Sequence, residues 1–213
     1  MDITFHQHHL SKQRGMGATV ILFTIALIVL VGAALAYSSR GSSKSLSVES
    51  AKVYSAIILK QSGEYREAYN RFIFDGNSAS TMTFDTTSGT GLFDPNKQYG
   101  INQSAPAQAI TTGATDAAWQ YNKSIFVSGI GIDTTGGADS IVYLNKLSLA
   151  ACQQINLQMY GDPIGTTIPS ATIALADFAI NNGTKTITAG GRATGCVATS
   201  DPFYIFYSTL AEN

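Results

Sequence analysis

An uncharged apolar run near the N-terminus is the strongest pattern in this chain. Residues 16–37 contain no Asp, Glu, Lys or Arg, whereas the residues before them include Lys12 and Arg14. A helix rises about 1.5 Å per residue, so this run would reach about 33 Å, which is enough to cross the hydrocarbon core of a bilayer. The pattern therefore predicts a transmembrane helix over residues 16–37.

A second helical pattern follows after a short polar break that contains Gly41. From Leu46 to Ile73, apolar residues recur three and four positions apart, and most of the charged residues fall between them. This spacing is typical of an amphipathic helix with one buried face. We expect residues 38–74 to continue the first helix. Four aromatic side chains are expected on the buried face: Tyr65, Tyr69, Phe72 and Phe74.

The chain after residue 74 is dominated by short segments in which apolar and polar residues alternate. Gly, Pro, Asn and Asp separate these segments, as they do in hairpins and loops. The pattern predicts a β-rich domain over residues 75–213, which begins with a long loop region over 75–122. The expected strands are residues 81–84, 123–132, 140–144, 171–180, 185–189 and 202–210.

One helical pattern interrupts the expected strands. Apolar residues recur every fourth position from Leu147 to Met159, and Gly161 is placed to end a helix. We therefore expect a short helix near residues 147–160. Together these elements predict an α+β fold in which a long N-terminal helix, first transmembrane and then amphipathic, packs on an antiparallel β-sheet.

The last expected strand is rich in aromatic residues. Side chains alternate across a strand, so Phe203, Ile205 and Tyr207 should share one face, and Tyr204 and Phe206 the other. One face is expected to lie in the core. The opposite face is a candidate interface with a neighbouring subunit or a target.

Composition and charge limit the functions that these elements can serve. Charged residues make up only 13% of the 213 residues, and the net charge is -1. Residues 73–213 carry five bases against ten acids, which argues against a nucleic-acid footprint across that surface. We therefore expect no nucleic-acid partner. The abundance of Gly, Ser, Thr and Asn favours an exported, turn-rich domain.

The residue types that catalysis usually needs are scarce. All three histidines lie before Gly15, which removes Ser-His-Asp and Cys-His catalysis and histidine metal sites from the rest of the chain. The acids are scattered, and most lie in expected turns. We expect no enzyme activity, no catalytic residue, no cofactor and no metal site.

Cys152 and Cys196 are the only cysteines. In an oxidising compartment, two cysteines without a further partner are interpreted as one disulfide. In the cytosol, where disulfides are rare, the same two cysteines would indicate little about the structure.

The segment Lys12-Gln13-Arg14-Gly15-Met16, followed by an apolar and then an amphipathic helix, resembles the class III leader and N-terminal helix of type IV pilins and pseudopilins. The resemblance implies that residues 1–15 are a leader, that a prepilin peptidase cuts after Gly15, and that Met16 becomes the methylated first residue. The two cysteines, one on a mid-domain helix and one near the C-terminus, are similar in layout to the longer type IVb pilins.

The same resemblance implies a function and partners. The chain would be a structural subunit of a type IV pilus-like filament, either a pilin or a minor pilin. It would be held in the inner membrane before assembly and lie in an extracellular filament or the periplasm afterwards. Its partners would be other pilin subunits, the prepilin peptidase and the inner-membrane assembly platform. Gly17, Val20 and Gly32 would lie in the assembly helix.

Val20 departs from the family, which usually has Glu at this fifth mature position to pair with a neighbouring N-terminal ammonium. A buried ammonium without a counter-ion is costly.

Other interpretations fit the same residues. Cleavage after Ala36 would release a secreted domain that begins at Tyr37, and no cleavage would leave an anchored adhesion or binding domain. A pseudopilin of a type II secretion system is a further alternative.

Overall fold

The computed structural model describes five stretches of the chain: residues 48–111, 117–131, 138–171, 173–179 and 185–212. The chain divides into two compact units, Met1–Ser47 and Val48–Asn213, and all described residues belong to the second. The expected leader, the expected transmembrane helix and the start of the amphipathic helix lie outside the described residues. Among the helices that are described, none has both the length and the hydropathy that a bilayer crossing requires.

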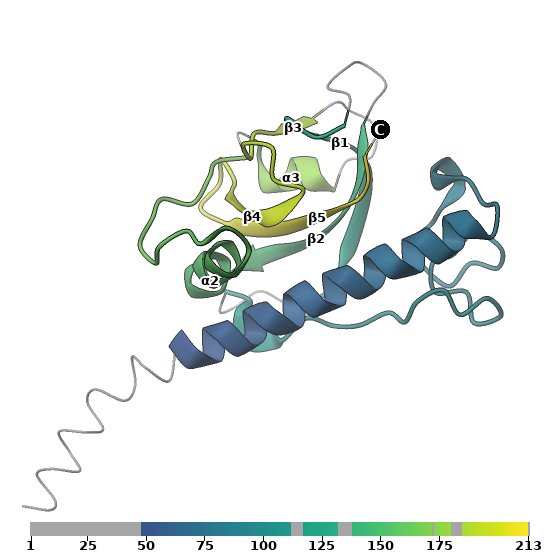
Figure 1. Ribbon diagram of the computed structural model, residues 1–213, viewed down its shortest axis with the longest axis horizontal. Helices are drawn as coiled ribbons and strands as arrows, with labels where there is room; N and C mark the ends of the chain where they lie inside the picture. The colour runs from purple at the N-terminus through teal and green to yellow at the C-terminus, as the bar shows by residue number, and fades with distance from the viewer. Residues whose placement is uncertain (1–47, 112–116, 132–137, 172, 180–184, 213) are drawn as a thin grey trace, which may run out of the picture. The chain divides into compact units, whose positions relative to one another are not determined.

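A long helix opens the described part of the chain and runs from residue 48 to residue 74. At about 1.5 Å per residue it extends for about 40 Å, and Figure 1 shows it as the dark-blue ribbon beside the sheet. It ends where Gly76 adopts φ 83° and donates its backbone N–H to the carbonyl of Ile73 at 2.9 Å. Glycine accepts this left-handed conformation without the steric cost that other residues have.

Five strands form one sheet in the order β3-β1-β2-β5-β4. The β1–β2, β2–β5 and β5–β4 pairs are antiparallel, whereas β3 runs parallel to β1. The α+β class is confirmed, and the expectation of a purely antiparallel sheet is wrong at β3. A long excursion through β2 and the helix after it separates β1 from β3, so no hairpin forces them to run in opposite directions. The strands are β1 Gln120–Val127, β2 Asp139–Leu147, β3 Lys185–Ile187, β4 Thr194–Ala198 and β5 Tyr204–Ala211.

Helix α2, Leu149–Tyr160, lies where the sequence pattern predicts a short helix. The Ser148 hydroxyl accepts a hydrogen bond from the backbone N–H of Ala151, which caps the helix start. At the other end, Gly161 adopts φ 74° and its backbone N–H donates to the carbonyl of Leu157. Both ends are therefore fixed by local residues.

The expected strand over residues 171–180 is not formed. Its described residues contain α3, Leu175–Phe178, instead. The Asp177 carboxylate accepts from the backbone N–H of Ala174 at 3.0 Å, which closes a turn of helix. This local side-chain bond competes with strand pairing, as aspartate often does near helix starts.

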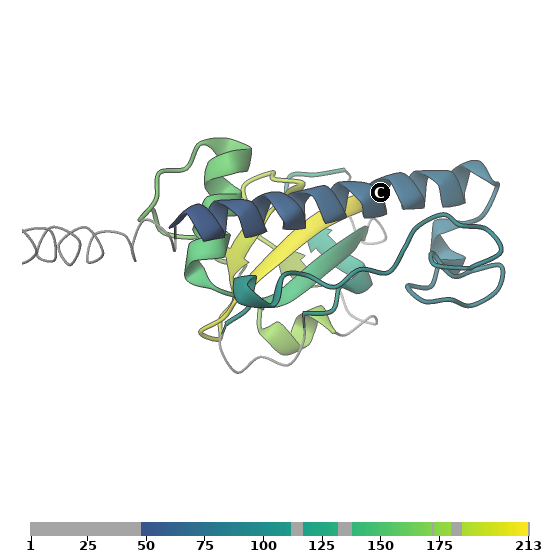
Figure 2. The same cartoon turned by 90° about the horizontal axis from the view of Figure 1, so that it is seen from below.

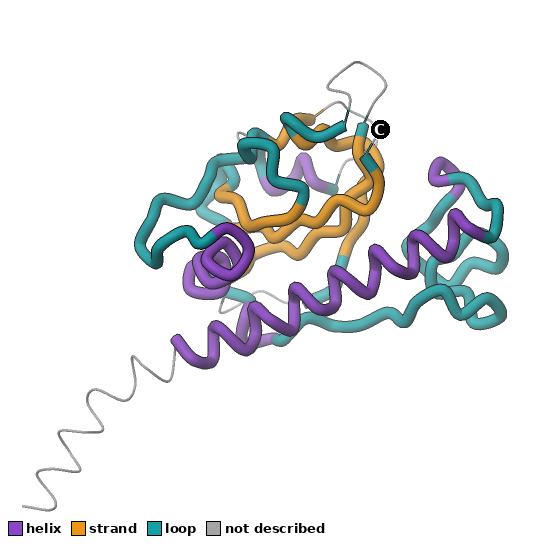
Figure 3. The backbone as a smooth tube through the Cα atoms, in the orientation of Figure 1, coloured by secondary structure: helices purple, strands orange, loops and turns teal. Residues whose placement is uncertain are grey.

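The region between the long helix and β1 is almost entirely loop (Figure 3). It contains two short 3-10 helices, η1 Ala79–Thr81 and η2 Ala107–Ala109. The expected strand over 81–84 reduces to one isolated bridge between Thr83 and Gly91. Strand β4 carries no alternating signal in its sequence, and the pattern did not predict it.

Each face of the sheet has its own core. One face, with Val142 and Phe206, packs against the long helix and α2. The opposite face, with Tyr143 and Ile205, packs against the segment that holds Phe178. Figure 2 shows the long helix crossing one side of the sheet, and Figure 1 shows α3 on the other side. The sheet is therefore a middle layer.

The aromatic strand β5 contributes to both cores. Tyr204 and Phe206 belong to the core beneath the long helix, and Ile205 and Tyr207 to the other. The predicted alternation of these four residues is confirmed. The interpretation of one β5 face as an interface is wrong, because Ile205 and Tyr207 are fully buried under the chain's own residues.

The outer edge of β4 is closed by side chains and by one short segment. The Asn156 side chain donates to the carbonyl of Cys196 and accepts from its N–H, both at 2.9 Å. Further along, Ala198 exchanges backbone bonds with residues 169–171 at 2.8 and 2.7 Å. Tyr160 donates its hydroxyl to the carbonyl of Thr194. An edge satisfied in this way no longer offers free backbone groups for pairing with another chain.

Candidate functional site

The structure reaches only part of the site that the sequence predicts. Gly15, Met16, Gly17, Val20 and Gly32 lie outside the described residues, so their processing and assembly roles stay predictions. In the sequence these residues precede the long helix, which begins at residue 48.

The predicted disulfide is confirmed. Cys152 on α2 and Cys196 on β4 are bonded, with their Cα atoms 5.3 Å apart, and both are fully buried. The bond anchors α2 against the edge of the sheet. The start of the long helix is joined to α2 in turn, because the Ser55 hydroxyl donates to the carbonyl of Ala151 at 3.1 Å.

The inner face of the long helix is buried, as the amphipathic pattern predicts. Tyr65 is its centre, and the Tyr65 ring meets the rings of Phe93 and Trp119 edge-on at centroid distances of 5.8 and 5.2 Å. Tyr69 and Phe72 are buried as expected. Phe74 is not: 91% of its surface is exposed. A step of two residues along a helix turns the side chain by about 200°, so Phe74 faces the side opposite to Phe72.

The solvent-exposed side of the same helix is the candidate site. Here Val53 and Ile57 keep 55% and 37% of their surface exposed, although both are aliphatic. A cluster of exposed apolar residues on one helix face is a common sign of a docking surface. We define the outer face as Val53, Ala56, Ile57, Lys60, Gly63, Glu64, Glu67, Asn70, Arg71 and Phe74.

Two ion pairs run along the outer face. Lys60 pairs with Glu64 at 3.4 Å, and Arg71 pairs with Glu67 one turn later. The side chain of Gln103 donates to Glu64 and, with Lys60, holds the pKa of that carboxyl below its usual value. The Glu64 carboxylate is therefore charged at neutral pH, and both ion pairs lie along one side of the helix. Exposed pairs of this kind add little stability on their own.

A segment of residues 99–104 lies beside the helix and is tied to it; we call it the tethered segment. Gln103 donates its backbone N–H to the Tyr65 hydroxyl at 2.9 Å, and the Gln61 side chain donates to the carbonyl of Ser104 at 3.0 Å. At Gly100 the two backbones approach closely, since an added Cβ would lie 2.8 Å from that of Ala68.

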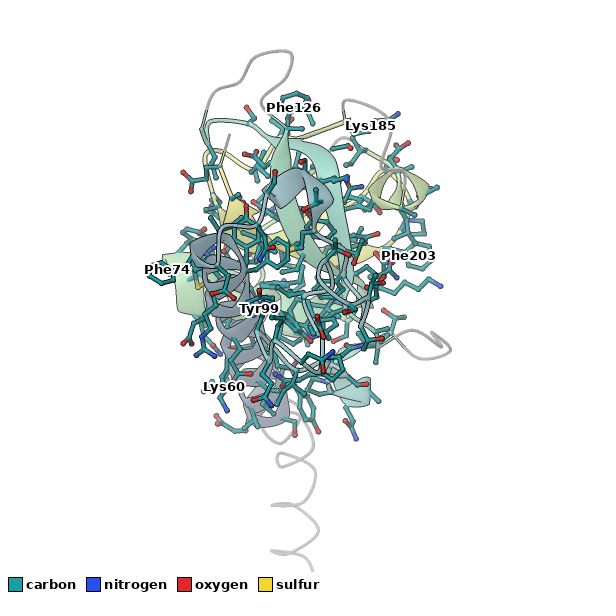
Figure 4. The ribbon with its side chains drawn as sticks, turned by 90° about the vertical axis from the view of Figure 1, so that its right-hand side faces the viewer. Lys60, Phe74, Tyr99, Phe126, Lys185 and Phe203 are labelled. Carbon is teal, nitrogen blue, oxygen red and sulfur yellow. A yellow bond between two sulfur atoms is a disulfide. The ribbon has the colours of Figure 1, made fainter. Side chains whose placement is uncertain are left out.

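An open groove runs along the C-terminal half of the helix and is bordered by the tethered segment and the turn before it. It comprises two hollows of about 700 and 610 Å³. Glu67, Arg71, Gln98 and Tyr99 line both hollows, so they form one continuous depression. Figure 4 shows Lys60 and Phe74 on one side of the molecule, with Tyr99 further inward. The groove is thus bordered by the outer face.

The groove has an apolar and an acidic character at once. Ile101, with 78% of its surface exposed, lines one hollow, and Phe74 lines the other. These two side chains are the most exposed of the large apolar residues described. Four acids line the groove against two bases: Glu64, Glu67, Asp75 and Asp94 against Arg71 and Lys97.

The turn that forms the far wall is held by Asp94. Its carboxylate accepts from the backbone N–H groups of Gly89 and Asn96, each at 2.8 Å, and these bonds lower the pKa of Asp94. Gln98 follows with φ 53°, a conformation that residues other than glycine rarely adopt. Its N–H donates to the Asp94 carbonyl at 2.9 Å. The wall is therefore fixed by local hydrogen bonds.

Exposed apolar side chains beside paired charges suit a docking contact. Within the described residues, no group of three or more His, Cys, Asp or Glu side chains is placed to hold a metal ion. The sequence pattern did not single out the outer face. Its signal was present, since Val53, Ile57, Lys60, Glu64, Glu67, Arg71 and Phe74 follow one another at alternating spacings of four and three.

Comparison with known proteins adds no relative: no family model, no curated protein and no solved structure matches this chain.

Proposed function

We propose that this chain is a structural subunit of a type IV pilus-like filament, a pilin or a minor pilin. In this proposal the leader is removed after Gly15, the apolar segment 16–37 holds the precursor in the inner membrane, and the same segment then packs against its copies in the filament. The partners are other pilin subunits, the prepilin peptidase and the inner-membrane assembly platform. No enzymatic step, cofactor or nucleic acid takes part.

The observation that carries the proposal is the long helix with one buried and one exposed face. Its inner face holds the sheet through Tyr65 and Phe72, and the residues that precede it in the sequence lead back to the apolar segment. A helix that only completed a globular core would need no apolar side chains on its outer face. Val53 and Ile57 lie there, and they come earlier in the sequence than the other large apolar residue of that face, Phe74.

The disulfide supports the export step of the proposal. Disulfides persist in the periplasm and outside the cell and are rare in the cytosol. The bond between Cys152 and Cys196 suits a domain that folds after crossing the membrane. It favours no particular filament, and a pseudopilin or an anchored adhesion domain would carry it equally well.

The mature N-terminus tests the proposal directly. We expect mass spectrometry of the protein purified from its own membrane or filament to find an N-methylated Met16. A chain that begins at Tyr37 would instead indicate secretion by ordinary signal peptidase, and an intact Met1 would indicate an uncut anchor. Either of these results overturns the filament proposal.

Val20 offers a second test. Small residues such as Gly17 and Gly32 permit close approach of helices, but Val20 supplies no partner for a buried ammonium. We expect Val20→Glu to increase incorporation into filaments, measured by immunoblotting sheared filaments against total cell protein. Val20→Leu is the matched control and should leave incorporation unchanged.

A further inference from the structure

The groove suits an occupant that is basic and partly apolar. Acids outnumber bases among the residues that line it. Hydrogen bonds lower the pKa of Glu64 and of Asp94, so both carboxylates are charged at neutral pH. The largely exposed side chains of Phe74 and Ile101 add an apolar part to the lining. A segment with positive charge and an apolar side chain would complement both properties.

The chain itself contains such a segment. We call residues 38–47 the linker, because they lie in the sequence between the expected transmembrane helix and the described part of the long helix. The linker contains two bases, Arg40 and Lys44, and no acid. Its other residues are six serines, one glycine and Leu46. Since most of these side chains are small, the linker is narrow enough for an open groove.

The bases of the linker lack the nearby acids that the bases of the long helix have. Three of the four bases described on that helix pair with a Glu three or four positions away: Lys52, Lys60 and Arg71. No Asp or Glu lies within four positions of Arg40 or of Lys44, so this local pairing is not open to them. Any carboxylate partner therefore comes from a distant part of the chain or from another copy.

We propose that the linker of one copy lies in the groove of a neighbouring copy that points in the same direction. This inference rests on the proposed function and names one contact between its subunits. Arg40 and Lys44 meet acids of the groove, among them Glu67, and Leu46 covers the exposed side chain of Ile101. Apolar contacts surrounded by polar ones are usual in protein interfaces.

The positions of the two surfaces determine how the copies are arranged. The linker precedes residue 48, whereas the groove borders the helix from Glu64 to Phe74. Copies that point in the same direction make the contact when one is displaced along the helix axis by roughly the length of the long helix, about 40 Å. Each copy offers its groove to one neighbour and its linker to another. Such a head-to-tail contact continues from copy to copy as a filament does.

The charge of the rest of the chain favours this contact over one between two β-rich domains. Residues 49–213 carry nine bases and thirteen acids, whereas residues 16–48 carry two bases and no acid. Two copies of the described domain therefore share the sign of their net charge, which opposes their association. Placing the basic linker of one copy on the acidic groove of the next gives an attractive contact instead.

Cysteine cross-linking in filaments tests the contact. Both native cysteines are used in the disulfide, so introduced cysteines can react only with each other. The full-length Ser43→Cys/Ile101→Cys variant carries one cysteine in the linker and one at the groove. Mild oxidation of its sheared filaments should yield a ladder of covalent multimers, because each copy is linked to two neighbours. Ser43→Cys/Thr186→Cys, with its second cysteine at an exposed site on β3, is the control and should yield no ladder.

Two results would overturn the inference. Oxidation of both introduced thiols in a product of monomer size would show that the linker lies in the groove of its own chain. A ladder no stronger than that of the control would show that the linker lies elsewhere in the filament.

Charge reversal tests the pairing itself. Lys44→Glu should lower incorporation into filaments at least about fivefold, because attraction to the groove becomes repulsion. Adding Glu67→Lys should restore incorporation, since the pair forms again with its charges exchanged. Lys44→Glu/Glu49→Lys is the matched control: its net charge is the same, but Glu49 is not among the residues that line the groove. Equal recovery in the two double variants would contradict the contact.

The mature N-terminus separates this inference from the proposed function. Filaments whose subunits begin at an N-methylated Met16 but show no ladder would refute the contact alone. A mature chain that begins at Tyr37 or at Met1 would refute the filament proposal, and the contact with it.

Discussion

The two faces of the long helix follow different rules although they share one backbone. The inner face contains large aromatic residues, is buried, and meets different partners at each turn. The outer face is exposed and carries balanced charges, with Lys60 and Arg71 against Glu64 and Glu67. The inner face therefore holds the helix on the β-rich domain of its own chain. Substitutions on the outer face should change the free energy of unfolding little, and its side chains are accessible to a partner. Stability should depend on the first and association on the second.

The largest effect is expected at the centre of the inner face. Tyr65→Ala should lower the free energy of unfolding by about 4 kcal/mol, as is typical when a buried aromatic side chain is removed. The outer-face control Phe74→Ala should change it by no more than about 0.5 kcal/mol. Fluorescence of Trp119, the only tryptophan, follows both transitions in urea. Equal losses in the two variants would contradict the division between the faces.

Alkaline pH should next weaken both cores, the one under the inner face through Tyr65 and the one on the other side of the sheet through Tyr143. Burial raises the pKa of Tyr65 and of Tyr143 to about 12 from the model-compound value of 10.0. The unfolded chain therefore releases these protons first, so stability is complete below pH 10 and falls as the pH rises toward 12. Each tyrosine contributes at most about 1.4 kcal/mol per pH unit.

Chemical denaturation at several pH values checks this dependence. Tyr65→Phe removes one ionisable hydroxyl and should make the loss between pH 10 and 12 less steep. A slope that is unchanged in Tyr65→Phe would show that this hydroxyl is not protected by the fold.

A buried polar contact should have a smaller effect. The Gln61 carbonyl oxygen accepts from the indole N–H of Trp119 at 3.0 Å, and its amide donates to the carbonyl of Ser104. Gln61→Ala leaves both partners unsatisfied and should cost about 1–3 kcal/mol. The emission of Trp119 should also shift. A cost below that of Phe74→Ala would contradict the role of Gln61 in holding the tethered segment.

The smallest effect on stability is expected on the outer face. Glu67→Gln removes one exposed ion pair with Arg71 and should change the free energy of unfolding by less than about 0.5 kcal/mol. Urea denaturation followed by the fluorescence of Trp119 measures this change. A loss as large as that of Tyr65→Ala would contradict the division between the two faces.

The sequence predicted elements whose patterns are local. The amphipathic spacing identified Tyr65, Tyr69 and Phe72 as buried, and the spacing from Leu147 to Gly161 located α2 to within two residues at its start. The disulfide followed from having two cysteines and no others. The prediction for Phe74 was wrong because a step of two residues from Phe72 turns the side chain by about 200°, to the opposite side of the helix.

Features that depend on distant partners were not predictable in the same way. Strand β4 exists because it pairs with β5 and because Asn156 and residues 169–171 satisfy its other edge. Residues 171–180 alternate as a strand would, yet the Asp177 side chain turns part of them into α3. The groove needs the tethered segment beside the helix, a placement set by Gln61 and Tyr65 across a long loop.

The position of β5 has a consequence for the order in which the β-rich domain can fold. This strand follows β4 in the sequence but lies between β2 and β4 in the sheet. A polypeptide that has emerged only as far as β4 therefore lacks the strand that β4 joins, and Cys196 cannot yet be held beside Cys152 by the finished sheet. Oxidation of this cysteine pair in the native arrangement should thus be a late event, after the residues of β5 have been made.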